Sequence, residues 1–370
     1  MKKILCNVIL FIIFMPGWLT SDVIMKVSVL GIFKPVRVIV STEKKEKYTI
    51  QAIWGETMEV NGKKQKEFIL KDPQPLTVEI PDKITRQFPG QLQIYCSEGK
   101  LIIVNHIPME DYLASVVHCE IGAAPAETLK AQAILCRTKA LEFYQRNKKR
   151  KYYISDLTDG QVYKGLSHMN LSAREAVNLT RDEVMSFKGK LATVFFCSTC
   201  AGETSYPGFV WKKEIEYIVP VKCEYKGTPL CIDSPHFKTW TWSCPLEQIS
   251  RVIPMGKFDH IDIIERDEFG RVSLLRFRNT WNMVLKTETF RIMVGRYFKD
   301  WGLLKSARFK VEIKDRKAFF TGQGLGHGVG LCQWGAKKLG ELGYKYRSIL
   351  GFYFPRLMIT DYYSLKNEDE

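Results

Sequence analysis

The sequence of 370 residues has no segment after residue 15 that could cross a membrane, and it has no internal repeat. It also lacks low-complexity stretches, which argues against a disordered or fibrous protein. Its composition of 45% hydrophobic and 26% charged residues is typical of a chain that buries a sizeable core. Length alone allows two or three structural units.

Motifs for nucleic-acid binding are also missing, although the chain carries a formal net charge of +15. Such a charge suits nucleic acid, an anionic membrane surface or an acidic polymer, so it constrains the partner only weakly. The densest basic run, residues 148–151, follows a predicted helix and is typical of a solvated loop. We therefore expect no nucleic-acid partner.

The first 21 residues have the pattern of a secretory signal peptide. Two lysines precede an apolar run from Ile4 to Met15, and small polar residues follow at Thr20 and Ser21. We expect cleavage near Ser21, with a retained membrane anchor as the alternative. Export would place the protein in the periplasm or at the outer face of the cytoplasmic membrane, where its cysteines could form disulfides.

Patterns of strands and helices divide the remaining chain. Residues 22–105 alternate between apolar and polar positions and predict a β-rich module. Residues 106–362 mix both patterns, with an inserted β-rich segment at about 207–305, so the predicted fold class is α+β. Two helices are expected early in this part, one from Pro108 to about Glu120 and one over about 126–146.

Glu120 is the candidate for acid and base chemistry. It lies on the same face of the first predicted helix as Leu113, Val116 and Val117. A carboxyl group on an apolar face has a raised pKa, which a general acid needs near neutral pH. The alternative is a glutamate at the helix end that turns to solvent.

A second catalytic carboxylate is not evident near Glu120. At about 1.5 Å per residue, Asp111 would lie roughly 13 Å along the helix. Glycosidases that use two carboxylates keep them roughly 5 to 9.5 Å apart. Asp156, Asp159 and Glu203 remain open as partners, so the sequence favours a one-carboxylate mechanism or a partner from elsewhere in the fold.

Alternating glycines from Gly322 to Gly330 match neither the dinucleotide nor the Walker spacing, which excludes a nucleotide site. Glycines allow close approach of a ligand, and here they could leave His327 and Gln333 on a bare surface where sugars bind. The alternative is a structural glycine turn with a satisfied histidine.

The cysteines of the central region allow several interpretations. Cys197 and Cys200 could be a redox pair, half of a zinc site or members of a disulfide set with Cys223, Cys231 and Cys244. One such pair is a weak zinc signal. We expect at least one disulfide, and the pair Cys223 and Cys231 across a short polar loop is favoured.

Several separated blocks, in the same order and across most of residues 106–355, closely resemble the SpoIID family. These blocks are Ile107 to Leu113, Val116 and Val117 with Glu120, Pro125 to Leu141, Gln161 to Tyr163, Ser198 and Thr199 with Gly202 and Thr204, Trp211, and Gly326 to Ala336.

The resemblance implies a secreted lytic transglycosylase that cuts peptidoglycan between N-acetylmuramic acid and N-acetylglucosamine. Glu120 occupies the position of the family's glutamate, which protonates the glycosidic oxygen and then acts as base on the muramoyl C6 hydroxyl. This mechanism forms a 1,6-anhydro end and needs no second carboxylate. Six further residues are expected to contact sugar: Gln161, Tyr163, Ser198, Thr199, His327 and Gln333.

The resemblance also implies partners. Family members prefer glycan strands without stem peptides and work beside an N-acetylmuramoyl-L-alanine amidase. Because relatives have been described as amidase enhancers, a peptidoglycan-binding protein without its own catalysis is the alternative function.

This chain departs from the family pattern in three places. Ile121 and Gly122 replace the usual Met-Pro after the glutamate, so the following loop is expected to be looser. Some members bind zinc just before the Gln-Val-Tyr block, but residues 153–160 contain neither His nor Cys, and we expect no metal and no cofactor. Cys200 and Cys332 replace smaller residues common in the family, and their role is open.

Overall fold

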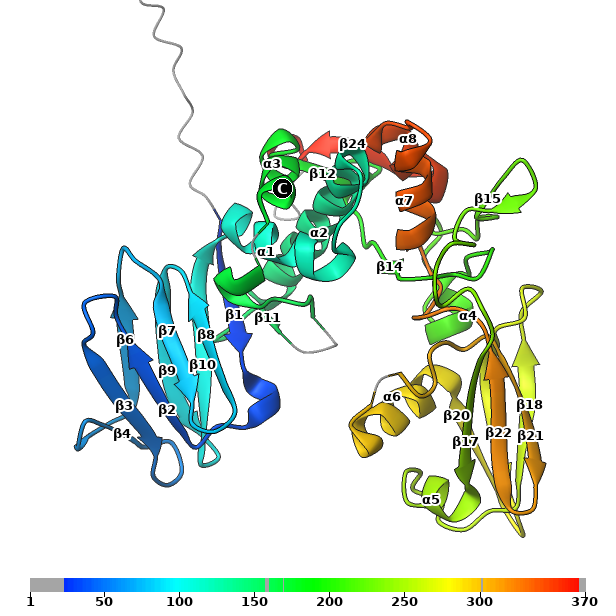
Figure 1. The fold of residues 1–370 in the computed structure, drawn as a ribbon, viewed down its shortest axis with the longest axis horizontal. Helices are drawn as coiled ribbons and strands as arrows, with labels where there is room; N and C mark the ends of the chain where they lie inside the picture. Colours follow the sequence, from blue (N-terminus) through cyan, green and yellow to red (C-terminus); the bar gives the residue numbers. More distant parts are fainter. Residues whose placement is uncertain (1–22, 157–159, 169, 301, 366–370) are drawn as a thin grey trace, which may run out of the picture.

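The computed structural model describes residues 23–156, 160–168, 170–300 and 302–365. The expected signal peptide and Asp159 therefore lie outside the described residues. Helices and strands are mixed, with a strand-rich N-terminal region, so the predicted α+β class is confirmed (Figure 1). Within the described ranges, every helix is too short or too polar to cross a membrane.

Two sheets form the N-terminal region and bury one face each in a shared core. Their strand orders are β11-β1-β10-β9-β6 and β5-β4-β3-β2-β7-β8. In strands β2 and β7, for example, every second side chain is buried, which is the alternation expected of a strand with one face in the core. The strands are β1 (Ile24–Val29), β2 (Arg37–Ser41), β3 (Lys47–Ala52), β4 (Met58–Val60), β5 (Lys63–Gln65), β6 (Glu67–Lys71), β7 (Leu76–Ile80), β8 (Ile84–Phe88), β9 (Gln91–Ser97), β10 (Lys100–Pro108) and β11 (Ile154–Ser155).

Three helices pack against these sheets and contribute side chains to the same core. They are α1 (Met109–Ile121), α2 (Ala126–Asn147) and α3 (Leu171–Leu179). Leu129 and Ala133 of α2 pack into the first core, whereas Ile134 and Leu135 pack into a second one. Because α2 is buried on two faces, it lies between the two cores and packs against both.

The second core gathers short strands and helices from distant parts of the chain. The predicted strand over Leu191 to Cys197 is paired only at its two ends. β14 runs parallel to β23, which brings Cys197 opposite Cys332. The elements around this core are β12 (Glu183–Phe187), β13 (Lys190–Leu191), β14 (Phe196–Cys197), α4 (Pro207–Trp211), β15 (Glu224–Tyr225), β16 (Thr228–Pro229), β23 (Leu331–Cys332), α7 (Gln333–Glu341), α8 (Tyr346–Tyr353) and β24 (Met358–Asp361).

The inserted segment has a third core of its own, built from residues 240–320. This range differs from the expected 207–305, because α4 and the β15–β16 hairpin pack into the second core. In Figure 1 the segment runs from green at β17 through yellow to orange at β22, and it lies away from the N-terminal sheets. Its elements are β17 (Trp240–Pro245), α5 (Leu246–Ser250), β18 (His260–Arg266), β19 (Val272–Arg278), β20 (Asn282–Lys286), α6 (Thr287–Phe298), β21 (Phe309–Lys314) and β22 (Lys317–Gly322).

A buried ion pair joins the first two helices. The guanidinium of Arg137 on α2 donates to both carboxylate oxygens of Glu110 on α1, at 2.9 and 2.6 Å. It also donates to the backbone carbonyls of Val177, Thr180 and Glu183. Because both charges are paired and the remaining donors are satisfied, the cost of burying the pair is offset and the helices are fixed relative to each other.

Replacement of this arginine should destabilise the protein strongly. Arg137→Leu leaves the Glu110 carboxylate without its partner, and such a loss costs roughly 3–5 kcal/mol. Urea unfolding followed by circular dichroism measures the change. As a control, Arg251→Leu removes the exposed ion pair with Glu247 and should leave the midpoint nearly unchanged. Equal losses for both variants would contradict the role given to Arg137.

Candidate active site

Glu120 lies in the last turn of α1, which ends where Gly122 takes a positive φ of 65°. Its side chain is half-buried and does not simply point into solvent. The carboxylate oxygen Oε1 accepts a hydrogen bond from the backbone N–H of Val162 at 2.8 Å. The carboxyl group is therefore held in one place by a distant loop.

Three effects set the proton affinity of this carboxyl group. Burial is the largest, and it raises the pKa of Glu120 above its ordinary value. The N–H of Val162 and the positive charge of Lys139 act in the opposite direction. The net rise agrees with the expectation from the sequence, and it extends to higher pH the range in which the group is protonated.

Two buried side chains hold the backbone around the amide that contacts the carboxylate. Gln161 accepts a hydrogen bond from the hydroxyl of Tyr112 at 3.2 Å and donates one to the carbonyl of Cys136 at 3.2 Å. The hydroxyl of Tyr163 donates to Oδ1 of Asn105 at 2.7 Å. The loop is thus anchored on both sides of its central residue.

This arrangement corrects the expected role of Gln161 and Tyr163. Each side chain is only 1% exposed, and its polar atoms are engaged within the protein, so neither presents a group to sugar. Their place in the structure is to position Val162. Sequence reasoning assigned them to the substrate because polar residues near a candidate acid look alike whether they bind or support.

His327 is the second conspicuous group of the region. Its ring centroid lies 4.9 Å from that of Trp211 and 6.2 Å from that of Phe195. Nδ1 accepts the backbone N–H of Val329 at 3.0 Å, so the proton of the neutral ring is on Nε2. Burial lowers the pKa of His327 to about 3, and Lys139 contributes to the lowering. Near neutral pH the imidazole is therefore uncharged, and it offers no positive charge to a substrate.

Lys139 connects these two groups and was not among the predicted site residues. Its ammonium lies 5.5 Å over the ring of Phe196, and its charge lowers the pKa values of both Glu120 and His327. It is half-buried on α2, between the buried residues Thr138 and Ala140. The sequence did contain a signal for this residue, because a lysine among the apolar residues of a predicted core helix is a candidate for a site residue.

Ser198, Thr199 and Gln333 come together through the pairing of β14 with β23. The carbonyl of Ser198 accepts the N–H of Trp334 at 3.1 Å, beside Gln333 at the start of α7. The hydroxyl of Thr199 is fully buried and shares a hydrogen bond of 2.6 Å with Ser234. Gln333 is also buried. Of these three, Ser198 is the half-buried residue that retains access for a ligand.

The glycine-rich segment is shaped by packing within the protein. Gly328 and Gly330 have positive φ angles of 78° and 74°. A Cβ at Gly328 would collide with the guanidinium of Arg271, and one at Gly330 with the carbonyl of Phe195. The glycines therefore allow close contact with protein atoms, which corrects the expected bare surface and favours the structural turn with a satisfied histidine.

The carboxylates considered as partners of Glu120 have contacts of their own. Asp111, which its distance along the helix already excluded, is ion-paired with Arg174 at 2.9 Å. Of the candidates left open, Asp156 accepts the N–H of Leu30 at 2.7 Å. Glu203 lies in the loop after β14 and interacts with Lys222. Within the described ranges, the charged side chain that shifts the candidate acid is a lysine and not a carboxylate.

Comparisons with known proteins find one matching family model and several relatives of modest identity. Residues 97–187 match the SpoIID family model, described as "Stage II sporulation protein". An uncharacterised protein of Brachyspira hyodysenteriae is 28% identical over 291 residues, 77% of this chain and 75% of the relative. The amidase enhancer of Bacillus subtilis is 27% identical over 297 residues, 68% of this chain but 40% of that protein. Stage II sporulation protein D of Bacillus amyloliquefaciens is 27% identical over 275 residues, with 70% and 76% coverage.

Removal of the lysine charge should raise the pKa of the candidate acid. In Lys139→Met the carboxylate loses a nearby cation, so the pKa of Glu120 should move further upward, and that of His327 should rise towards its ordinary value. Carbon-detected NMR titration of the side chains measures both. The control is Lys130→Met on the same helix, whose ammonium pairs with Glu127. An unchanged Glu120 pKa in Lys139→Met would mean that the lysine does not face the carboxyl group.

Proposed function

We propose that the protein is a peptidoglycan lytic transglycosylase, because residues 97–187, which contain Glu120, match the SpoIID family model. The family match and a relative named amidase enhancer support a peptidoglycan-related function. The observation that carries the proposal is the raised pKa of a single glutamate whose carboxylate is held by the amide of Val162. Its substrate is the bond between N-acetylmuramic acid and N-acetylglucosamine in glycan strands.

In the proposed reaction, Glu120 first donates its proton to the glycosidic oxygen as the bond from that oxygen to muramoyl C1 breaks. The C6 hydroxyl of the same sugar then forms a bond to C1 and returns its proton to the carboxylate. An attacking group already tethered to the sugar gains a large effective molarity over water. One carboxyl group therefore suffices for both proton transfers, and no cofactor is required.

Lys139 supports a preference for strands that have lost their stem peptides. Removal of the peptide frees the lactyl carboxylate of muramic acid, which adds a negative charge to the sugar beside the scissile bond. A half-buried ammonium that already acts on Glu120 offers the complementary charge. This preference fits a partner amidase, an N-acetylmuramoyl-L-alanine amidase that produces such strands, and a site of action in the periplasm or on the outer face of the cytoplasmic membrane.

The second candidate function is that of a peptidoglycan-binding protein that enhances a partner amidase. It is favoured by the name of the Bacillus subtilis relative and by Ile121 and Gly122 after the glutamate. In that case the chain would bind glycan without cutting it.

Digestion of peptide-free glycan strands tests the proposal. The unaltered protein should release fragments whose muramic ends are lighter by one water than hydrolytic ends, as measured by mass spectrometry. Glu120→Gln preserves the shape of the side chain but removes the transferable proton, so cleavage should fall by roughly 10²- to 10⁴-fold while glycan binding remains. Asp111→Asn, a change on the same helix, is the matched control and should keep most of the activity.

Other outcomes would point elsewhere. Near-normal cleavage by Glu120→Gln would overturn the assignment of the acid. Binding without cleavage by the unaltered chain, together with stimulation of an added amidase, would favour the enhancer function. Hydrolytic ends alone would indicate a second carboxylate, and Glu203 would be the first residue to replace.

A further inference from the structure

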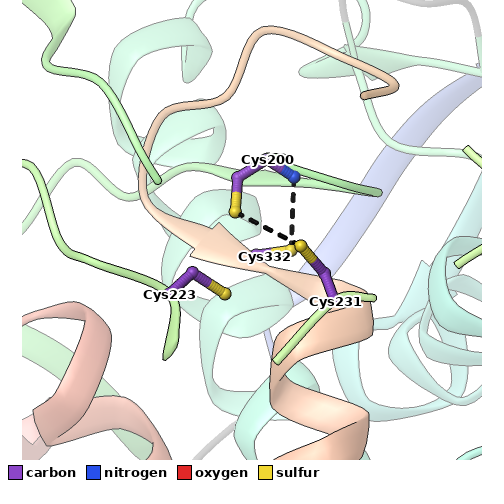
Figure 2. A group of neighbouring side chains, drawn as sticks. All are labelled: Cys200, Cys223, Cys231 and Cys332. Carbon is purple, nitrogen blue, oxygen red and sulfur yellow. Dashed lines mark hydrogen bonds between the residues drawn. The ribbon is translucent and has the colours of Figure 1, made fainter. Parts of the chain in front are cut away.

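Four cysteines from separate parts of the chain meet in the second core, away from Glu120. Cys200 follows β14, Cys223 and Cys231 flank the β15–β16 hairpin, and Cys332 ends β23. All four are buried, and their sulfur atoms lie within 4.8 Å of one another. Figure 2 shows the four side chains converging from these elements. Nothing in the proposed cleavage reaction uses them.

We propose that these four thiols bind one zinc ion in a tetrahedral structural site. With Zn–S bonds of about 2.3 Å, the sulfurs of a tetrahedral site lie about 3.8 Å apart. The sulfurs of Cys200 and Cys231 are 3.8 Å apart in the structure. The backbone thus already places ligands at the spacing that the ion requires.

A single zinc ion fits this arrangement better than a disulfide or a polynuclear iron–sulfur cluster does. All described cysteines are free thiols, including Cys223 and Cys231, which were expected to form a disulfide. A disulfide brings two sulfurs to about 2.05 Å and has no need of a second pair at the same place. A polynuclear cluster holds iron and sulfide atoms between its thiolates, so it needs more room than these four sulfurs leave.

Hydrogen bonds to the sulfurs support the thiolate form that a metal needs. The backbone N–H of Cys200 donates to the sulfur of Cys332 at 3.3 Å, and the N–H of Gly202 donates to that of Cys231. The hydroxyl of Tyr353 lies 3.1 Å from the sulfur of Cys223, and a thiolate at Cys223 would accept a hydrogen bond from this hydroxyl. Such outer partners orient and stabilise the ligands of metal sites.

The surrounding charge is also complementary. Four thiolates and one Zn²⁺ carry a net charge of −2, which a buried site must offset. The guanidinium groups of Arg271 and Arg308 donate to the carbonyls of Cys200 and Ala201. Arg271 is only 1% exposed, its Nε and Nη1 have no hydrogen-bond partner, and it forms no ion pair with any residue that the structure describes. A dianionic centre beside Cys200 supplies the missing counter-charge.

Four protein ligands leave no open coordination position, so the role of this site is structural. The ion would join the loop that carries Ser198, the β15–β16 hairpin and the start of α7 into one unit. Binding converts up to four thiols to thiolates and releases their protons to solvent. This inference revises the expected absence of a metal, which rested on residues 153–160, a different part of the chain.

Metal analysis of the purified full chain tests the site. Zinc should be present in about an equimolar amount. After removal of zinc and addition of Co²⁺, the chain should show the intense visible absorption of tetrahedral cobalt with thiolate ligands. Cys231→Ser should lose most of the metal and unfold at lower temperature, whereas Cys244→Ser, a buried cysteine of the inserted segment, should keep the metal.

The cobalt spectrum of the unaltered chain keeps the test decisive if Cys231→Ser fails to fold. Mass mapping without reduction provides the opposing result. Disulfides among Cys200, Cys223, Cys231 and Cys332 would overturn the proposal. So would a reduced, folded chain that takes up neither zinc nor cobalt.

Discussion

The bidentate contact between Arg137 and Glu110 fixes the helix that carries the candidate acid. Arg137 belongs to α2, which is buried in two cores, and Glu110 lies in the first turn of α1. Two residues further along α2, Lys139 projects on another side of the helix, towards Phe196 and His327. One helix therefore sets both the orientation of α1 and the position of the cation that lowers the pKa of Glu120.

The chemistry of Glu120 depends on this rigidity, because opposing effects determine its proton affinity. Burial favours the neutral acid, and the Val162 amide favours the carboxylate that remains after proton transfer. The amide can act only because Gln161 and Tyr163 are locked into the core on either side of it. A small displacement of that loop would change the pKa of Glu120, on which its proposed roles as acid and base depend.

The sequence predicted the helices over 109–121 and 126–147 within a residue or two, because their apolar periodicity is strong. It also predicted the environment of Glu120, which follows from the same helical face. The roles of Gln161 and Tyr163 could not be predicted, because they depend on contacts with Tyr112 and Asn105 that only the folded chain makes.

Two other features were hidden by sequence distance. Residues 207–239 have the same aromatic and polar composition as the inserted segment, so their membership in the second core could not be seen in the sequence. Cys200 and Cys332 are 132 residues apart, and only the parallel pairing of β14 with β23 brings them together.

The antiparallel pairing of β17 with β22 has a consequence for how this protein can evolve. Trp240 lies opposite Gly322, so the chain enters and leaves the inserted segment at nearly the same point. The path of the chain would therefore allow the segment to be exchanged or shortened without a change in the rest of the fold. Its side chains do not allow this so freely, because Arg271 and Arg308 donate from the segment to the backbone carbonyls of Cys200 and Ala201. A lineage that lost the segment would therefore also lose the two cations that hold this loop.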